Sequence, residues 1–150
     1  MTGEETTARP AESLDAGAER RIRESFARQT MMQTFGATIE SLSPGMCRIA
    51  APILPGALQQ HGFGHAALTF ALGDTAAGYA ALSLMPAEAE VLTAEMKVNL
   101  LAPAKGDRLL AVGKVVKAGR RLVIVTAEVT AEDGDRRTPV ALLQGTMIPA

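Results

Sequence analysis

Residues 65–79, HAALTFALGDTAAGY, are built almost wholly from small and apolar residues and predict a helix. One stripe runs along this helix at the spacing typical of a core-facing surface, through Leu68, Leu72, Thr75, Tyr79 and Leu82. A helix of this composition belongs in the core of a domain. The sequence therefore predicts a long buried helix that the rest of the chain must cover.

Asp74 stands in the middle of this helix on a different stripe, among small residues at positions 67, 71, 78 and 81. An ionised carboxylate in a core is costly unless it is paired, hydrogen-bonded or put to use. The small neighbours leave room for the close approach of a substrate, a strand or a second subunit. From this helix alone, a structural role and a functional role for Asp74 are equally open.

The length and composition of the chain predict a single globular domain. It has 150 residues, of which 47% are hydrophobic, and a formal net charge of −1, which gives no reason to expect nucleic acid or an anionic membrane as a partner. No apolar run reaches membrane-spanning length, and the first residues lack a signal-peptide pattern, so we expect a cytoplasmic protein. The single cysteine, Cys47, is expected in the core.

The N-terminal part of the chain divides into a tail and a short helix. Residues 1–18 are rich in Glu, Thr, Ala and Pro without periodicity, which predicts a disordered or loosely attached tail and a domain over residues 19–150. The segment ERRIRESFARQTMMQ, residues 19–33, predicts an amphipathic helix with Ile22, Phe26 and either Met31 or Met32 facing inward. Its arginines are expected in solvent.

Strand patterns flank the central helix on both sides. Residues 35–53 contain two β-like runs around Ser43-Pro44-Gly45, which predicts a hairpin. Residues 91–104 alternate, which predicts a half-buried strand whose apolar face carries Leu92, Ala94, Met96, Val98 and Leu100. Residues 108–148 supply three further strands, separated by turns at 117–120 and 132–135.

The predicted element order is β-β-α-β-β-β-β. Consecutive strands joined by tight turns imply an antiparallel sheet, and the single long helix must cover its apolar face. The fold class is therefore α+β.

The motif QQHGFGHAALTFALGD, residues 59–74, resembles the signature of PaaI-like and 4-hydroxybenzoyl-CoA-type thioesterases. In that signature an amide residue precedes a His-Gly-Gly helix start, and an acid follows nine positions after the histidine; Gln59, His65 and Asp74 keep this spacing. Residues 92–107 and 115–129 also resemble the family's later strand and its Gly-Arg hairpin. The resemblance covers Met31 to the C-terminus and implies a hotdog fold, in which the sheet wraps around the long helix.

The resemblance also implies a chemistry, the hydrolysis of acyl-CoA thioesters, with no cofactor beyond the coenzyme A of the substrate. Asp74 would be the general base or the nucleophile, and Gln59 would orient the water or the acid. The backbone N–H of Ala66, in the first turn of the helix, would form the oxyanion hole. Thr93 matches a family hydroxyl near the acid, although an outward-facing strand residue is an equally good interpretation.

Two departures from the family pattern bear on the site. Ala66 and Ala67 replace the two glycines that follow the histidine, so the donor is kept while an added Cβ takes up space near the thioester. Gly78 stands where some members carry a threonine that helps to hold the water.

Other candidate groups have weaker patterns. His61, His65 and Asp74 do not make a metal site, because no further ligands lie at suitable spacing; His65 is better explained as a helix-start residue that fixes the loop of Gln59. No serine lies in a nucleophile-elbow motif. Charged hairpin turns are usually just solvated, but three residues could reach the phosphates of coenzyme A: Arg120, which matches the family's Gly-Arg turn, Lys105 and Lys117.

The helix geometry predicts an assembly. A continuous helix separates Ala66 from Asp74 by about 12 Å, too far for both to act on one carbonyl. In a two-fold dimer with antiparallel helices, Asp74 of one subunit would meet the Ala66 N–H of the other, giving two composite sites. The resemblance implies such dimers, often paired into tetramers.

Two other functions remain alternatives to an acyl-CoA thioesterase. One is a non-catalytic acyl-CoA-binding hotdog protein. The other is a hotdog hydratase, although the Asp-x-x-x-x-His pair of the hydratases is missing after Asp74.

Overall fold

The computed structural model describes residues 13–150 of the chain. Its elements follow the predicted order, with a second short helix near the N-terminus. They are α1 (Ala16–Ala27), α2 (Thr30–Thr34), β1 (Thr38–Ser43), β2 (Met46–Pro52), the 3-10 turn η1 (Pro55–Ala57), α3 (Ala66–Leu82), β3 (Val91–Leu100), β4 (Arg108–Ala118), β5 (Val123–Asp133) and β6 (Arg136–Pro149).

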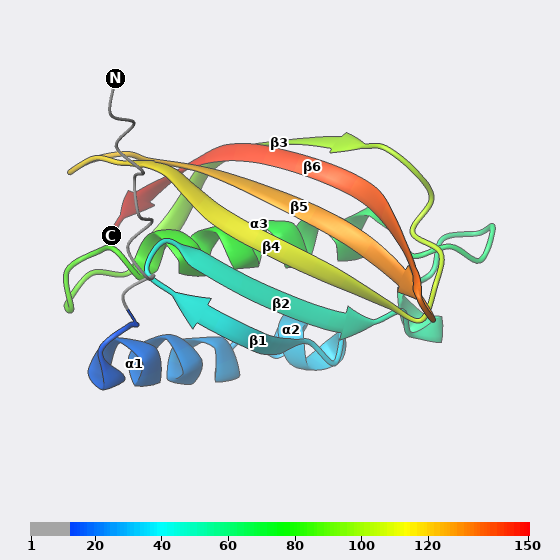
Figure 1. Ribbon diagram of the computed structural model, residues 1–150, viewed down its shortest axis with the longest axis horizontal. Coiled ribbons are helices and arrows are strands. Elements are labelled where there is room, and N and C mark those ends of the chain that lie inside the picture. The colour runs from blue at the N-terminus through cyan, green and yellow to red at the C-terminus, as the bar shows by residue number, and fades with distance from the viewer. Residues whose placement is uncertain (1–12) are drawn as a thin grey trace, which may run out of the picture.

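The six strands form one antiparallel sheet in the order β1-β2-β4-β5-β6-β3. The sheet curves around α3, as Figure 1 shows, and α3 packs mainly against β4 with the other inner strands around it. This arrangement confirms the α+β hotdog fold. It leaves β1 and β3 as the two edges of the sheet.

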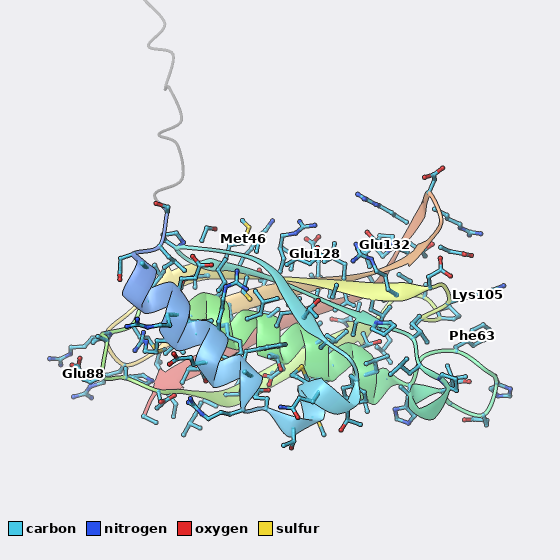
Figure 2. The ribbon with its side chains drawn as sticks, turned by 90° about the horizontal axis from the view of Figure 1, so that it is seen from below. Met46, Phe63, Glu88, Lys105, Glu128 and Glu132 are labelled. Carbon is cyan, nitrogen blue, oxygen red and sulfur yellow. The ribbon has the colours of Figure 1, made fainter. Side chains whose placement is uncertain are left out.

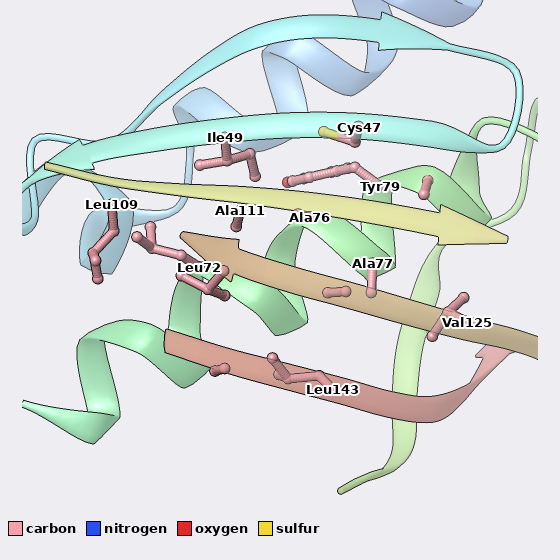
Figure 3. Close-up of a cluster of buried hydrophobic side chains, with 14 of the residues drawn as sticks. Cys47, Ile49, Leu72, Ala76, Ala77, Tyr79, Leu109, Ala111, Val125 and Leu143 are labelled. Carbon is pink, nitrogen blue, oxygen red and sulfur yellow. The ribbon is translucent and has the colours of Figure 1, made fainter. Parts of the chain in front are cut away.

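The core lies between α3 and the concave face of the sheet. In Figure 3, Ile49, Leu109 and Leu143 from three strands converge on Leu72 and Tyr79 of α3. Of the predicted stripe, only Thr75 is not fully buried.

Gly113 marks the closest approach of sheet and helix. A Cβ on Gly113 of β4 would overlap the backbone of Ala76 and Ala77 in α3. The absence of a side chain therefore allows this strand to lie directly on the helix.

The prediction for residues 91–104 was wrong in one respect. The alternation is broken by a bulge, because the register of β3 against β6 shifts between Thr93 and Glu95. Leu92 and Leu100, which were predicted to face the core, are 55% and 57% exposed. The extra residue at the bulge turns Leu92 away from α3 and Thr93 toward it. Beyond the bulge, Met96 and Val98 pack against the core as predicted, and Leu100 is the exposed last residue of the strand.

The predicted tail overlaps the first helix. Residues 1–12 lie outside the described part of the chain, but α1 already begins at Ala16, where Asp15 accepts hydrogen bonds from the N–H groups of Gly17 and Ala18. An Asp at this position is a typical N-cap, which the compositional interpretation overlooked. The first helix therefore begins before residue 19, within the range assigned to the tail.

Helix α1 packs on the C-terminal half of α3. Phe26 meets Tyr79 edge to face, and Ile22 is fully buried. In the next helix Met32 is the inward residue and Met31 the exposed one. The arginines of α1 were all expected in solvent, and for Arg21 this was wrong. Its guanidinium donates hydrogen bonds to three backbone carbonyls of the turn after α3, at residues 86, 87 and 89.

Candidate active site

Asp74 is half-buried in the middle of α3, and Thr93 Oγ1 donates a hydrogen bond of 2.8 Å to its Oδ1. Burial raises the pKa of Asp74 above its ordinary value, while the hydrogen bond from Thr93 lowers it. A partly desolvated carboxylate that still reaches a cavity is suited to accepting a proton. The structure thus brings together two of the predicted site residues, Asp74 and Thr93.

A cavity of about 160 Å³, called here the acid-side cavity, opens beside Asp74. Its walls include Ser25 of α1, Gln29 of the link between α1 and α2, Gly78 and Tyr79 of α3, and Thr93 of β3. This volume is close to that of an engineered cavity, about 150 Å³, which binds benzene. The acid-side cavity is therefore large enough for a compact group beside the carboxylate.

A small polar network lies in the wall of this cavity. Gln29 Nε2 donates a 2.8 Å hydrogen bond to Tyr79 Oη, and Ser25 Oγ lies 3.1 Å from the same hydroxyl. The sequence interpretation missed Ser25 and Gln29. The available signal was the place of Gln29 on the apolar stripe of the amphipathic helix, seven positions after Ile22, where an inward polar side chain needs a partner.

The N-terminus of α3 presents one backbone donor. His65 caps the helix through Nδ1, which accepts a 2.8 Å hydrogen bond from the N–H of Ala67, and the N–H groups of Leu68 and Thr69 both donate to the His65 carbonyl. Within residues 13–150 the N–H of Ala66 has no acceptor. This N–H therefore remains free at the positive end of the helix dipole, where a developing oxyanion is stabilised.

Gln59 is held in the loop that leads into α3. Its Oε1 accepts hydrogen bonds from the N–H groups of His61 and Phe63, the latter at 3.2 Å. Its Nε2 has no acceptor in the described chain, so Gln59 is free to donate a hydrogen bond to a ligand. His61 is exposed in the same loop.

A second cavity, of about 470 Å³ and called here the donor-side cavity, is lined by Gln59, Ala66 and mostly apolar residues of the strands and loops nearby. No residue lines both this cavity and the acid-side cavity. Because α3 is continuous from Ala66 to Asp74, the free N–H and the carboxylate lie about 12 Å apart along its axis. Within one chain, therefore, the predicted base and the predicted oxyanion donor are not brought together.

The three predicted phosphate-binding residues lie at opposite ends of the molecule. Lys105 follows Ala104, whose carbonyl accepts from Gly64 near the start of α3. Lys117 and Arg120 lie at the β4–β5 hairpin, beyond Val115, near the end of α3. All three side chains are exposed.

The part of the chain that the structure describes has no group of three or more His, Cys, Asp or Glu side chains placed to hold a metal ion. None of its helices has the length and apolar character needed to cross a membrane.

Residues 61–138, just over half of the chain, match the model of the thioesterase superfamily. The chain belongs to this superfamily. This chain is 42% identical to a thioesterase family protein from Silicibacter pomeroyi. The two structures superpose with a TM-score of 0.86, over 88% of this chain and 97% of that one. The chain is also 33% identical to a candidate esterase of Deinococcus radiodurans over 77% of this chain and 75% of the relative.

The Escherichia coli PaaI protein, from the phenylacetic acid degradation operon, shares the fold of this thioesterase. The two superpose with a TM-score of 0.82 at 22% identity, over 92% of this chain and 96% of that one. The hotdog fold and the family together identify the protein as a hotdog-fold thioester hydrolase.

Proposed function

We propose that this thioesterase hydrolyses acyl-CoA at composite sites, each made by Asp74 of one subunit and the Ala66 N–H and Gln59 of another. The observation that carries the proposal is the separation of the two halves of the site along α3. A base and an oxyanion donor must reach the same carbonyl, which one rigid helix cannot arrange. Two antiparallel copies of α3 satisfy this requirement twice in a symmetric dimer.

The exposed surfaces of the chain support a second copy as the partner. α1 covers the C-terminal half of α3, but Ala66, Ala67, Phe70, Ala71 and Asp74 in the N-terminal half are not fully buried. Beside them β3 is a free sheet edge of ten residues, with exposed leucines near both ends. An exposed sheet edge of this length offers unpaired backbone groups to another strand. A dimer, alone or paired into a tetramer, would cover both surfaces.

In the proposed reaction Asp74 removes a proton from a water molecule as the water oxygen attacks the thioester carbonyl carbon. The tetrahedral oxyanion accepts a hydrogen bond from the Ala66 N–H, whose removal would cost about 2.7–4 kcal/mol. The C–S bond then breaks, the free acid is released, and the CoA thiolate receives the proton. Attack by Asp74 itself, through an anhydride that water hydrolyses, uses the same groups, and the geometry fits both routes.

The remaining groups have supporting roles in this proposal. Thr93 orients Asp74 and favours its charged form through their hydrogen bond. Gln59 uses its free Nε2 to hold the water or the substrate oxygen. His65 holds the start of α3, so it acts through Ala66 rather than on the substrate.

The acyl group of the substrate occupies the acid-side cavity in this proposal. A cytoplasmic location is part of the proposal because it follows from acyl-CoA as the substrate.

Complementation tests the composite site. Asp74→Asn and Gln59→Ala should each be inactive alone. After the two variants are dissociated and reassociated together, a mixed dimer carries one doubly damaged site and one intact site, so acyl-CoA hydrolysis should return. If mixed dimers form, as shown by differently tagged subunits, and the mixture stays inactive, the composite site is wrong.

A panel of acyl-CoA substrates tests the activity itself. Turnover of at least one thioester, lost in Asp74→Asn, is the expected result. Binding of aliphatic and aromatic acyl-CoAs without hydrolysis would instead favour the non-catalytic alternative.

A further inference from the structure

A third cavity adjoins the donor-side cavity, and its position raises the question of which part of a ligand it could hold. It has a volume of about 260 Å³ and shares Phe63, Ala102 and Pro103 with the donor-side cavity. Figure 2 shows Phe63 and Lys105 together at one end of the molecule, with Glu88 at the other. The two cavities therefore adjoin along this shared wall, and the pair is called here the path from the Ala66 N–H to Lys105.

The new cavity is the basic part of this path. Its charged lining consists of Lys105, Arg136 and Asp133, so cations exceed anions by one. Neither Lys105 nor Arg136 forms an ion pair within residues 13–150, whereas the adjacent Arg137 lies 3.4 Å from Glu132. Both cations are therefore uncommitted. They come from separate segments, the loop after β3 and the start of β6.

The donor-side cavity differs in character. Its lining is mostly apolar, from Phe63, Leu100, Pro103 and their neighbours, and its polar groups gather at the Gln59 and Ala66 end. The path therefore offers a carbonyl-binding donor, an apolar stretch and two cations, in that order. Coenzyme A offers a thioester, a flexible arm and phosphate groups in the same order.

We infer that Lys105 and Arg136 bind phosphate groups of the CoA moiety, and that the donor-side cavity of the same subunit holds the arm between phosphate and sulfur. This inference rests on the proposed function and extends it by Arg136, which lies outside the motifs that resemble the family. A guanidinium can bind two phosphate oxygens at once, and a neighbouring ammonium adds a point charge. The substrate then lies with its CoA portion on the subunit that supplies Ala66, and its acyl group points toward Asp74 of the other.

The test compares two thioesters of one acyl group, the acyl-CoA and the N-acetylcysteamine thioester, which lacks phosphate. Arg136→Gln and Lys105→Gln should each raise KM for the acyl-CoA about fivefold, the size expected for one exposed charge contact. Hydrolysis of the N-acetylcysteamine thioester should not change, which also shows that the variants fold. Asp133→Asn removes the one acid of the cavity and should lower KM for the acyl-CoA only.

Two matched variants complete the test. Arg20→Gln, on the exposed face of α1, makes the same change in net charge and should have no effect on either substrate. Arg120→Gln probes the other basic hairpin. If only Arg120→Gln weakens the acyl-CoA, or if Arg136→Gln affects both substrates equally, the phosphate assignment is overturned.

Calorimetric titration with free CoA separates this inference from the proposed function. Weaker CoA binding by Arg136→Gln, with binding of pantetheine unchanged, supports the phosphate site even if the wild-type protein hydrolyses no acyl-CoA. Unchanged CoA binding overturns the phosphate site even if hydrolysis is fast.

Discussion

Replacing Gly78 by alanine should stabilise the protein while narrowing the acid-side cavity. Gly78 lies inside α3, where glycine costs about 0.8–1.0 kcal/mol relative to alanine. The nearest atom to an added Cβ, apart from the helix itself, is Met147 Cε at 3.9 Å, an ordinary contact. The melting temperature of Gly78→Ala should therefore rise by about 2–4 °C, as about 1 kcal/mol does in a chain of this size.

The same methyl group should alter the acyl preference. Gly78 lines the cavity of about 160 Å³ beside Asp74, which has room for little more than one ring. One methyl group in such a pocket changes discrimination by about tenfold or more. The ratio of kcat/KM for benzoyl-CoA to that for acetyl-CoA should fall by about this factor, with acetyl-CoA hydrolysis nearly unchanged.

Gly113→Ala is the matched control, since its Cβ would overlap the backbone of α3 at Ala76 and Ala77. It should lower the melting temperature, because overpacking costs about 1–3 kcal/mol. A lower melting temperature for Gly78→Ala would refute the packing argument. An unchanged substrate ratio, measured for a variant that is stabilised as expected, would show that the acyl group does not enter this cavity.

Three further predictions concern the reacting groups. Asp74→Asn should lower kcat by at least about 100-fold, the usual contribution of a general base, with the circular dichroism spectrum unchanged; activity within a few-fold of wild type would exclude the assignment. Thr93→Val removes a hydrogen bond that lowers the pKa of Asp74, so the acidic limb of the pH profile of kcat should move to higher pH, and a limb that stays or moves down would contradict this role. Ala66→Gly removes a Cβ beside the free N–H and should raise kcat/KM for bulky thioesters, whereas a uniform fall across substrates would show that the site has adapted to alanine.

The sequence predicted the features that depend on local patterns. The central helix, the succession of strands along the chain and the turn at Ser43-Pro44-Gly45 follow from periodicity and turn residues, which act over a few positions. The pairing of Asp74 with Thr93 followed only from the resemblance, since 19 positions separate the two residues.

Features that depend on distant partners were not predictable in the same way. The bulge in β3 is a mismatch of register with β6, a strand about 50 residues later, so the alternation of β3 alone could not reveal it. The basic cavity of Lys105 and Arg136 exists because the β5–β6 hairpin folds back beside the loop after β3. Lys105 was a candidate from the sequence, but Arg136 stands in a hairpin turn of mixed charge, residues 132–137, where nothing in the sequence sets it apart from Arg137.

Helix α1 lies outside the part of the chain that carries the predicted catalytic groups, although it contributes to the wall of the acid-side cavity. The region matched by the thioesterase superfamily begins at residue 61, after α1 has ended, and it contains the carboxylate, the helix N-terminus and the threonine. Ser25 and Gln29 nevertheless form part of the cavity wall from outside that region. With the acyl group in the acid-side cavity, as proposed, substitutions in and just after α1 would change the range of acids released without altering Asp74, Ala66 or Thr93. This peripheral segment is then the natural one to randomise when the enzyme is redesigned for a new acid.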